Sequence, residues 1–167
     1  LPKEVNSPTE SQAKSASPSS GYSMGIMLGY PVYMSAGFFL GKGAPVYSAI
    51  FSTPFGFSFG PVEFGLGAKI GMYDFSDEGE YSGLMILGTL NAAVYESTRG
   101  PVSIELGGGY YGASIGVTSG LNYSYRILGA PLVVNPYLRT NTALSSGMND
   151  MGSLTWISVG LYLSYIF

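Results

Sequence analysis

Two residue types are missing from the sequence, and charged residues are scarce. The chain contains no cysteine and no histidine, and only 10% of its residues are charged. Without cysteine the chain cannot form disulfides or thiolate metal sites, and without histidine it lacks the side chain that most often serves as a general base. We therefore expect a protein that is not an enzyme and that binds neither a metal nor a cofactor.

Basic side chains are too few and too scattered for nucleic acid binding. The sequence has 7 Lys and Arg against 10 Asp and Glu, which gives a net charge of −3 at pH 7. Proteins that bind nucleic acid neutralise its phosphates with clustered Lys and Arg. We therefore do not expect nucleic acid as a partner.

Long apolar runs are absent as well, although the chain is not polar. Gly, Ser, Thr or a charged residue interrupts every apolar stretch before it reaches the length of about 18 residues that a transmembrane helix requires. Yet 46% of the residues are hydrophobic, and the chain contains 25 Gly and 14 Tyr, which is typical of neither a soluble domain nor a disordered chain. Such a chain can cross a membrane only as strands closed into a barrel, because hydrocarbon offers no partner to unpaired backbone groups.

The sequence divides into a short polar segment and one domain. Residues 1–20 are rich in Ser, Pro and charge and hold few apolar side chains, which predicts an extended tail or linker. Residues 21–167 have the length of a single domain. The chain begins without Met and shows no signal-peptide pattern, which we interpret as a mature exported protein or a trimmed chain.

Alternation of apolar residues with small or polar ones predicts about eight strands. The clearest strand follows the Gly60-Pro61 break, where Phe64, Leu66 and further apolar residues alternate with Gly, Glu and Lys. Pro136 interrupts the seventh strand. The predicted strands cover residues 22–30, 47–59, 62–73, 83–95, 102–110, 121–127, 132–139 and 155–167.

The connections alternate between compact and long. Compact breaks occur at residues 60–61, 99–101 and 129–131, whereas residues 31–45, 74–81, 112–120 and 141–152 form longer connections. Outer-membrane barrels join their strands by short periplasmic turns and longer outer loops, so this pattern predicts that both termini are periplasmic. Residues 31–45 remain open to a second interpretation, in which they extend a strand pair and change the strand count.

The C-terminal sequence LYLSYIF ends on an aromatic residue that follows apolar residues at alternate positions. It resembles the terminal-strand signal of bacterial outer-membrane barrels, in which Tyr165 and Phe167 would be read by the assembly machinery. Together with the strand layout, residues 21–167 resemble the small eight-stranded class typified by OmpA, OmpX and OmpW. The resemblance implies an all-β, closed antiparallel up-and-down barrel in the outer membrane of a Gram-negative bacterium, in contact with its lipid. It implies no particular activity, because one fold hosts many functions.

Aromatic residues gather near the predicted periplasmic strand ends. Their parity is that of the lipid-facing side chains, which predicts an aromatic girdle at the membrane interface. The alternative is that aromatic residues simply favour strands. The predicted girdle consists of Tyr22, Phe57, Phe59, Phe64, Tyr125, Tyr165 and Phe167.

Five charged residues have the opposite parity and are predicted to point into the barrel: Glu63, Lys69, Glu105, Arg126 and Arg139. Glu105 and Arg126 lie on neighbouring strands at similar distances from the periplasmic end, so we predict an ion pair between them, with Glu63 nearby. Such pairs can simply fill a narrow lumen, where an unpaired charge is costly. Alternatively, they line a gated ion path. Inward glycines leave the choice open, because they provide space for a path and also room for large inward residues such as Tyr111, Trp156 and Tyr162.

Three classes of function are compatible with these features. The favoured one is a structural or interaction barrel, a subunit of a cell-envelope assembly that contacts a protein partner through its loops or residues 1–20. The second is a narrow pore for ions or small solutes, although side chains can fill an eight-stranded barrel. The third is a soluble lipocalin-like carrier with its apolar parity inside, which would need a more strongly charged exterior than this sequence provides.

Overall fold

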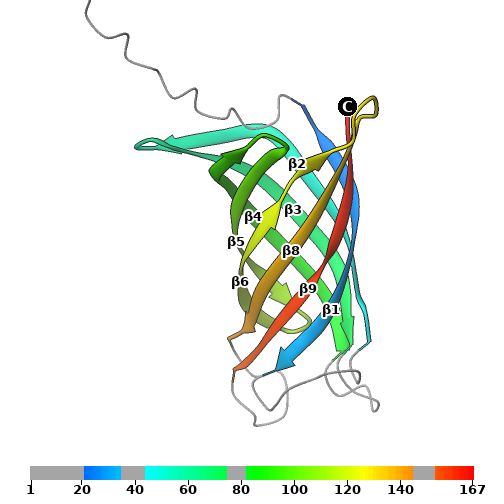
Figure 1. Cartoon of the computed structure of the whole chain (residues 1–167). Coiled ribbons are helices and arrows are strands. Elements are labelled where there is room, and N and C mark those ends of the chain that lie inside the picture. Colours follow the sequence, from blue (N-terminus) through cyan, green and yellow to red (C-terminus); the bar gives the residue numbers. More distant parts are fainter. Residues whose placement is uncertain (1–20, 35–43, 75–81, 145–152) are drawn as a thin grey trace, which may run out of the picture.

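The computed structural model of the chain describes residues 21–34, 44–74, 82–144 and 153–167. These residues form strands joined by turns, and Figure 1 shows that the strands, tilted relative to the barrel axis, wrap into a barrel. Within the described part of the chain, no helix is long and apolar enough to span a membrane. The predicted tail, residues 1–20, lies outside the described residues.

All strand pairings are antiparallel, and the sheet closes on itself because β1 pairs with β9. β7 continues the line of β6 beyond Ser124, and both pair with β8, so the nine strands form the eight walls of an up-and-down barrel. The strands are β1 (Ser23–Met34), β2 (Val46–Phe59), β3 (Val62–Asp74), β4 (Ser82–Ser97), β5 (Gly100–Tyr111), β6 (Ser114–Tyr123), β7 (Tyr125–Arg126), β8 (Leu132–Ala143) and β9 (Leu154–Ile166).

The predicted eight-stranded layout is confirmed, but the sixth strand begins earlier than predicted and two of the predicted connections are wrong. Residues 112–120 are not a long connection, since Gly112 adopts a φ of 59° in a tight turn and β6 begins at Ser114. Likewise β8 continues to Ala143, so the connection predicted at 141–152 starts later. Of residues 31–45, the first four extend β1 to Met34, and residues 35–43 lie outside the described part.

Pro136 lies within β8 but marks the place where the neighbouring wall is interrupted. β8 pairs with β6 as far as Asn122↔Tyr137 and with β7 from Tyr125↔Val134 onward. Proline has no backbone N–H to donate to a ladder. The predicted interruption of the seventh strand is wrong, because β8 runs unbroken through Pro136, and the break lies in the neighbouring wall between β6 and β7.

The two faces of the barrel differ as the alternation predicts. The outer face is apolar and exposed on every wall, with residues such as Ile26, Met72 and Leu161. The inner face buries polar and charged side chains, including Lys69 and Glu105. The apolar parity thus points outward, which contradicts the soluble lipocalin-like alternative and predicts a lipid environment.

Candidate functional site: the barrel lumen

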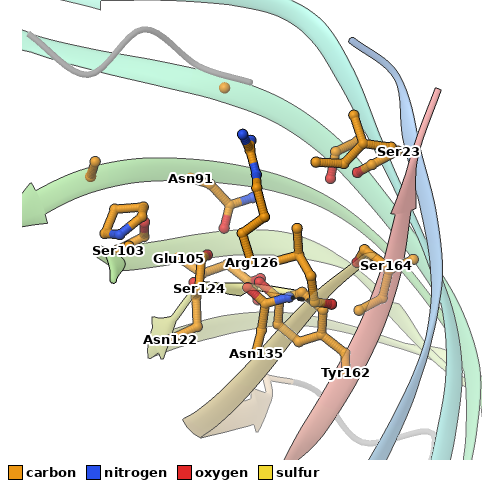
Figure 2. Close-up of a pocket in the computed structure, with 18 of the residues that line it drawn as sticks. Ser23, Asn91, Ser103, Glu105, Asn122, Ser124, Arg126, Asn135, Tyr162 and Ser164 are labelled. Atoms are coloured by element: carbon orange, nitrogen blue, oxygen red, sulfur yellow. Dashed lines mark hydrogen bonds between the residues drawn. The ribbon is translucent and has the colours of Figure 1, made fainter. Parts of the chain in front are cut away.

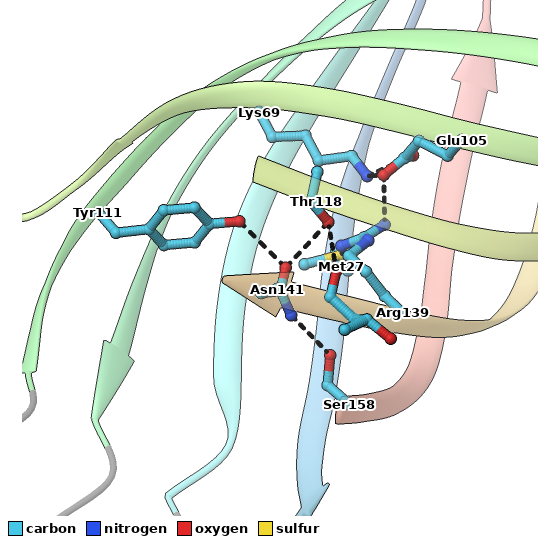
Figure 3. A network of polar contacts seen from close by, with 9 residues as sticks. Met27, Lys69, Glu105, Tyr111, Thr118, Arg139, Asn141 and Ser158 are labelled. Atoms are coloured by element: carbon cyan, nitrogen blue, oxygen red, sulfur yellow. Dashed lines mark hydrogen bonds and ion pairs between the residues drawn. The ribbon is translucent and has the colours of Figure 1, made fainter. Parts of the chain in front are cut away.

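Three charged residues from three walls meet inside the barrel. Glu105 of β5 accepts hydrogen bonds from the Lys69 ammonium of β3, and its Oε1 lies 3.1 Å from Nη2 of Arg139 in β8. Their exposed fractions are 2%, 2% and 3% for Glu105, Lys69 and Arg139. Figure 3 shows the three side chains reaching toward one another. We call Lys69, Glu105 and Arg139 the ion cluster.

The predicted pairing of Glu105 with Arg126 is wrong, since Glu105 binds Lys69 and Arg139. The register explains the difference: Glu105 lies opposite Gly120, and Gly120 lies opposite Arg139. Because glycine has no side chain, nothing at that level separates the carboxylate from the guanidinium. Arg126 belongs to β7, nearer the strand end, and its side chain is exposed.

The ion cluster carries one more positive than negative charge, and Arg139 has further contacts that accommodate it. Its Nη1 lies 3.0 Å from the sulfur of Met27, and its guanidinium carbon lies 4.5 Å from the centre of the Tyr137 ring. Sulfur and aromatic faces are polarisable and attract a desolvated cation. The guanidinium is therefore held on several sides within the lumen.

A neutral hydrogen-bond network continues from the ion cluster toward the barrel end opposite the chain termini. Asn141 Oδ1 accepts from the Tyr111 hydroxyl at 3.1 Å and from the Thr118 hydroxyl at 3.0 Å. Its Nδ2 donates to Ser158 Oγ at 3.4 Å. One buried amide thus links β5, β6, β8 and β9 (Figure 3).

Three large aromatic side chains fill the lumen near the end opposite the termini. Trp156 stacks on Tyr73 with ring centres 5.7 Å apart, and it meets Tyr111 edge-on at 5.1 Å. All three are among the largest fully buried side chains. We call Tyr73, Tyr111 and Trp156 the aromatic cluster, and its packing shows that this part of the lumen is occupied by protein.

Two inward glycines lie against bulky luminal side chains, one beside Tyr111 and one beside Tyr137. A Cβ on Gly116 would lie 2.5 Å from the Tyr111 ring, and one on Gly29 would lie 2.0 Å from the Tyr137 hydroxyl oxygen. These glycines therefore provide room for large inward residues. At these two positions, the packing interpretation of the inward glycines describes the lumen better than the open-path interpretation.

A polar cavity of about 500 Å³ occupies the other half of the lumen. It extends from Glu105 to the barrel end that holds Tyr22 and Phe167, which we call the terminal end, and Glu63 and Arg126 line it. Figure 2 shows Arg126 among the polar residues of this cavity. The five predicted luminal charges thus divide into two sets: Lys69 and Arg139 lie in the ion cluster, Glu63 and Arg126 line the cavity, and Glu105 belongs to both.

The aromatic residues at the terminal end contact one another. Tyr22 lies 5.9 Å from Phe51, 6.3 Å from Phe55 and 6.4 Å from Phe167, measured between ring centres. Tyr165 lies 6.3 Å from Phe167. Phe51 and Phe55 were missing from the predicted girdle, although their shared parity with Phe57 identifies them. Lipid contact by the girdle, and an assembly signal at Tyr165 and Phe167, remain predictions.

The described residues contain no group of three or more side chains that could hold a metal ion.

No protein-family model matches the chain, and no curated protein matches it. Among solved structures, the chain is similar to that of Neisserial surface protein A (NspA), with a TM-score of 0.53 and 15% identity over 89% of this chain and 98% of that one. At this identity the similarity shows the fold alone, which is that of the small outer-membrane β-barrels.

Proposed function

We propose that this protein is a non-conducting barrel of the bacterial outer membrane with a structural or interaction role, a subunit of a cell-envelope assembly. The observation that carries the proposal is the obstruction of the lumen by side chains between the polar cavity and the end opposite the terminal end. The ion cluster bridges β3, β5 and β8, and the aromatic cluster packs beyond it. Side chains are able to fill an eight-stranded barrel completely, so a closed lumen agrees with its size.

The placement in the membrane rests on the surface of the barrel. Its outer face is apolar on every wall. Three compact turns, at residues 60–61, 98–99 and 127–131, lie at the terminal end, as in barrels whose short turns are periplasmic, and one compact turn, at residues 112–113, lies at the opposite end. In this orientation the termini and the polar cavity face the periplasm. The interaction role is then assigned to residues 1–20, which would leave the barrel on the side where envelope proteins are accessible. No catalytic activity is part of the proposal.

Removal of residues 1–20 is expected to abolish association with a periplasmic partner and to leave the barrel intact. Intact cells would be cross-linked, and proteins isolated with the full chain would be compared with those isolated with the truncated chain. A matched full-length chain with Leu161→Ala on the outer face serves as the control. If both versions isolate the same proteins, or neither isolates any, the interaction role assigned to residues 1–20 is wrong.

A narrow pore is the second candidate, and the polar cavity favours it. Glu63 and Arg126 line this cavity, which reaches Glu105 from the terminal end. The described contacts that separate it from the opposite end are those of the ion cluster, the Asn141 network and the aromatic cluster. Movement of these side chains would be required to open a path.

Conductance in planar lipid bilayers distinguishes the two candidates. The wild-type chain is expected to give no channel steps, because its ion cluster and aromatic cluster obstruct the lumen. The double variant Tyr111→Ala/Trp156→Ala removes two of the obstructing rings and serves as a comparison. Reproducible steps from the wild-type chain, with an ion selectivity that Lys69→Met alters, would establish the pore and refute the non-conducting proposal.

A further inference from the structure

At the terminal end, the β2–β3 hairpin extends beyond the ladders that join it to β1 and β4. The pairing of β1 with β2 ends at Ser23↔Ser52, and that of β3 with β4 ends at Phe64↔Ala92. The ladder between β2 and β3 nevertheless continues to Phe59↔Val62. Figure 1 shows this hairpin leaving the barrel wall and running sideways past the adjacent strands.

An irregularity in β2 lies at the base of the projecting hairpin. Ser52 lies opposite Gly67, but the next pair is Gly56↔Gly65, so β2 contains two additional residues at this point. The Thr53 hydroxyl lies 3.1 Å from the carbonyl oxygen of Leu66, and Pro54 beside it has no N–H to donate. Bulges bend the strand that contains them. The sequence at this bulge therefore accounts for the change in direction.

The two faces of the hairpin are chemically different. Phe57↔Phe64 and Phe59↔Val62 lie on one face, whereas Ser58↔Glu63 lies on the other. The rings of Phe57 and Phe64 stack with centres 5.2 Å apart. Phe57 is 50% exposed and Phe59 78% exposed, so the apolar face has little cover from the described residues.

The apolar face of the hairpin continues the lipid-facing surface of the barrel. β3 alternates without a shift from Val62 through Phe64 to Ile70, which lies on the outer face of the wall. On the β2 side, Phe55 contacts Tyr22, which in turn stacks on Phe167. The projecting residues are therefore joined to the aromatic residues at the terminal end of the barrel.

We propose that the β2–β3 hairpin is a membrane-surface element whose aromatic face, formed by Phe55, Phe57, Phe59 and Phe64, rests in the headgroup region of the adjacent phospholipid leaflet. Aromatic rings favour that region, and an element with one apolar and one polar face lies in the plane of the interface. The polar face, with Ser58 and Glu63, then points to water. The inference rests on the proposed membrane placement and extends it beyond the barrel wall.

A phospholipid surface fits this face better than a protein does. The aromatic residues of the hairpin share the parity of the barrel's lipid-facing side chains, and Phe55 connects them to Tyr22 and Phe167. A protein that covered this face would therefore also have to displace lipid around Tyr22 and Phe167. The face formed by the hairpin's aromatic residues also carries no charged group for specific pairing. A second copy of the chain or another protein is therefore treated as an outcome that would refute the proposal.

Single-cysteine spin labelling tests the proposal directly, because the native chain has no cysteine. The variants Phe57→Cys, Phe59→Cys and Ser58→Cys would each carry a nitroxide, in the full chain reconstituted into phosphatidylethanolamine–phosphatidylglycerol vesicles. Collisions with oxygen, which concentrates in lipid, would be compared with collisions with a water-soluble nickel chelate. The outward Leu161→Cys in β9 provides the deep-lipid reference, and heat-modifiable gel migration verifies folding.

The oxygen-to-nickel collision ratio is expected to alternate along the hairpin. The ratio at positions 57 and 59 should be several-fold higher than at position 58 and lower than at position 161. Water-like ratios at 57 and 59 would refute the proposal, and so would few collisions with either reagent, since that result indicates burial against protein. A water-like ratio at 161 would instead refute the membrane placement itself, so the two failures are distinguishable.

Discussion

Replacing Glu105 with alanine is expected to lower the free energy of unfolding by about 3–5 kcal/mol, the cost of removing one partner from a buried ion pair. Glu105 supplies the carboxylate that lies between the Lys69 ammonium and the Arg139 guanidinium, and both cations are buried. Without it, two like charges would face each other in a lumen that provides little solvation. The loss should therefore exceed that of a surface salt bridge, which is about 0–1 kcal/mol.

Urea unfolding in lipid vesicles would measure this effect, with Trp156 as the reporter because it is the chain's single tryptophan. The triple variant Lys69→Met/Glu105→Ala/Arg139→Met removes all three charges and is expected to recover most of the lost stability. Glu63→Ala changes a carboxylate that lines the cavity outside the ion cluster, and it is the matched control. If Glu105→Ala unfolds at the same urea concentration as Glu63→Ala, the ion cluster does not stabilise the barrel.

Local alternation was sufficient to predict the two faces of the barrel and its strands, except for the first part of β6. In β3, the apolar residues that include Phe64 and Ile70 occupy one parity and Lys69 the other, so the lipid-facing and luminal surfaces follow directly from the sequence. The same reasoning placed Glu105 and Arg139 inside the barrel. Whether an inward charge lies beside another one depends on register, and alternation by itself does not determine register.

The error at the ion cluster follows from one turn. The sequence between Tyr111 and Leu121 was interpreted as a long connection, so the pairing register of β6 with β5 was not determined. The structure places only Gly112 and Ala113 in that turn, which aligns Glu105 with Gly120 and hence with Arg139. A two-residue turn after Tyr111 predicts Glu105 opposite Gly120, and the register of β6 with β8 is needed in addition to predict Arg139 as the partner.

The aromatic cluster and the projecting hairpin depend on contacts that no single strand contains. Tyr73, Tyr111 and Trp156 come from three strands that are distant in sequence, and their packing requires Gly116 to leave space for one of the rings. The hairpin requires the bulge between Ser52 and Gly56, whereas the alternation of its aromatic residues is compatible with a straight strand. Such features become visible only when the strands are assembled.

Replacing Trp156 with alanine is expected to lower the free energy of unfolding by about 3–5 kcal/mol, as for other large buried aromatic residues. The buried indole packs against both Tyr73 and Tyr111, so its removal leaves a cavity within the aromatic cluster. Trp156→Phe keeps an aromatic ring and should lose much less. Loss of heat-modifiable gel migration with increasing urea would compare the two variants without a tryptophan signal.

The comparison also tests what closes the lumen. If Trp156→Ala is as stable as Trp156→Phe, the aromatic cluster is loosely packed and cannot be the permanent obstruction that the non-conducting proposal requires. If Trp156→Ala is destabilised, yet the molecules that remain folded still give no channel steps in bilayers, the ion cluster and the Asn141 network block the lumen without the indole. Stability and conductance measured on one variant thus separate the two layers of the lumen, because the indole packs against Tyr73 and Tyr111, whereas Lys69, Glu105 and Arg139 form the ion cluster.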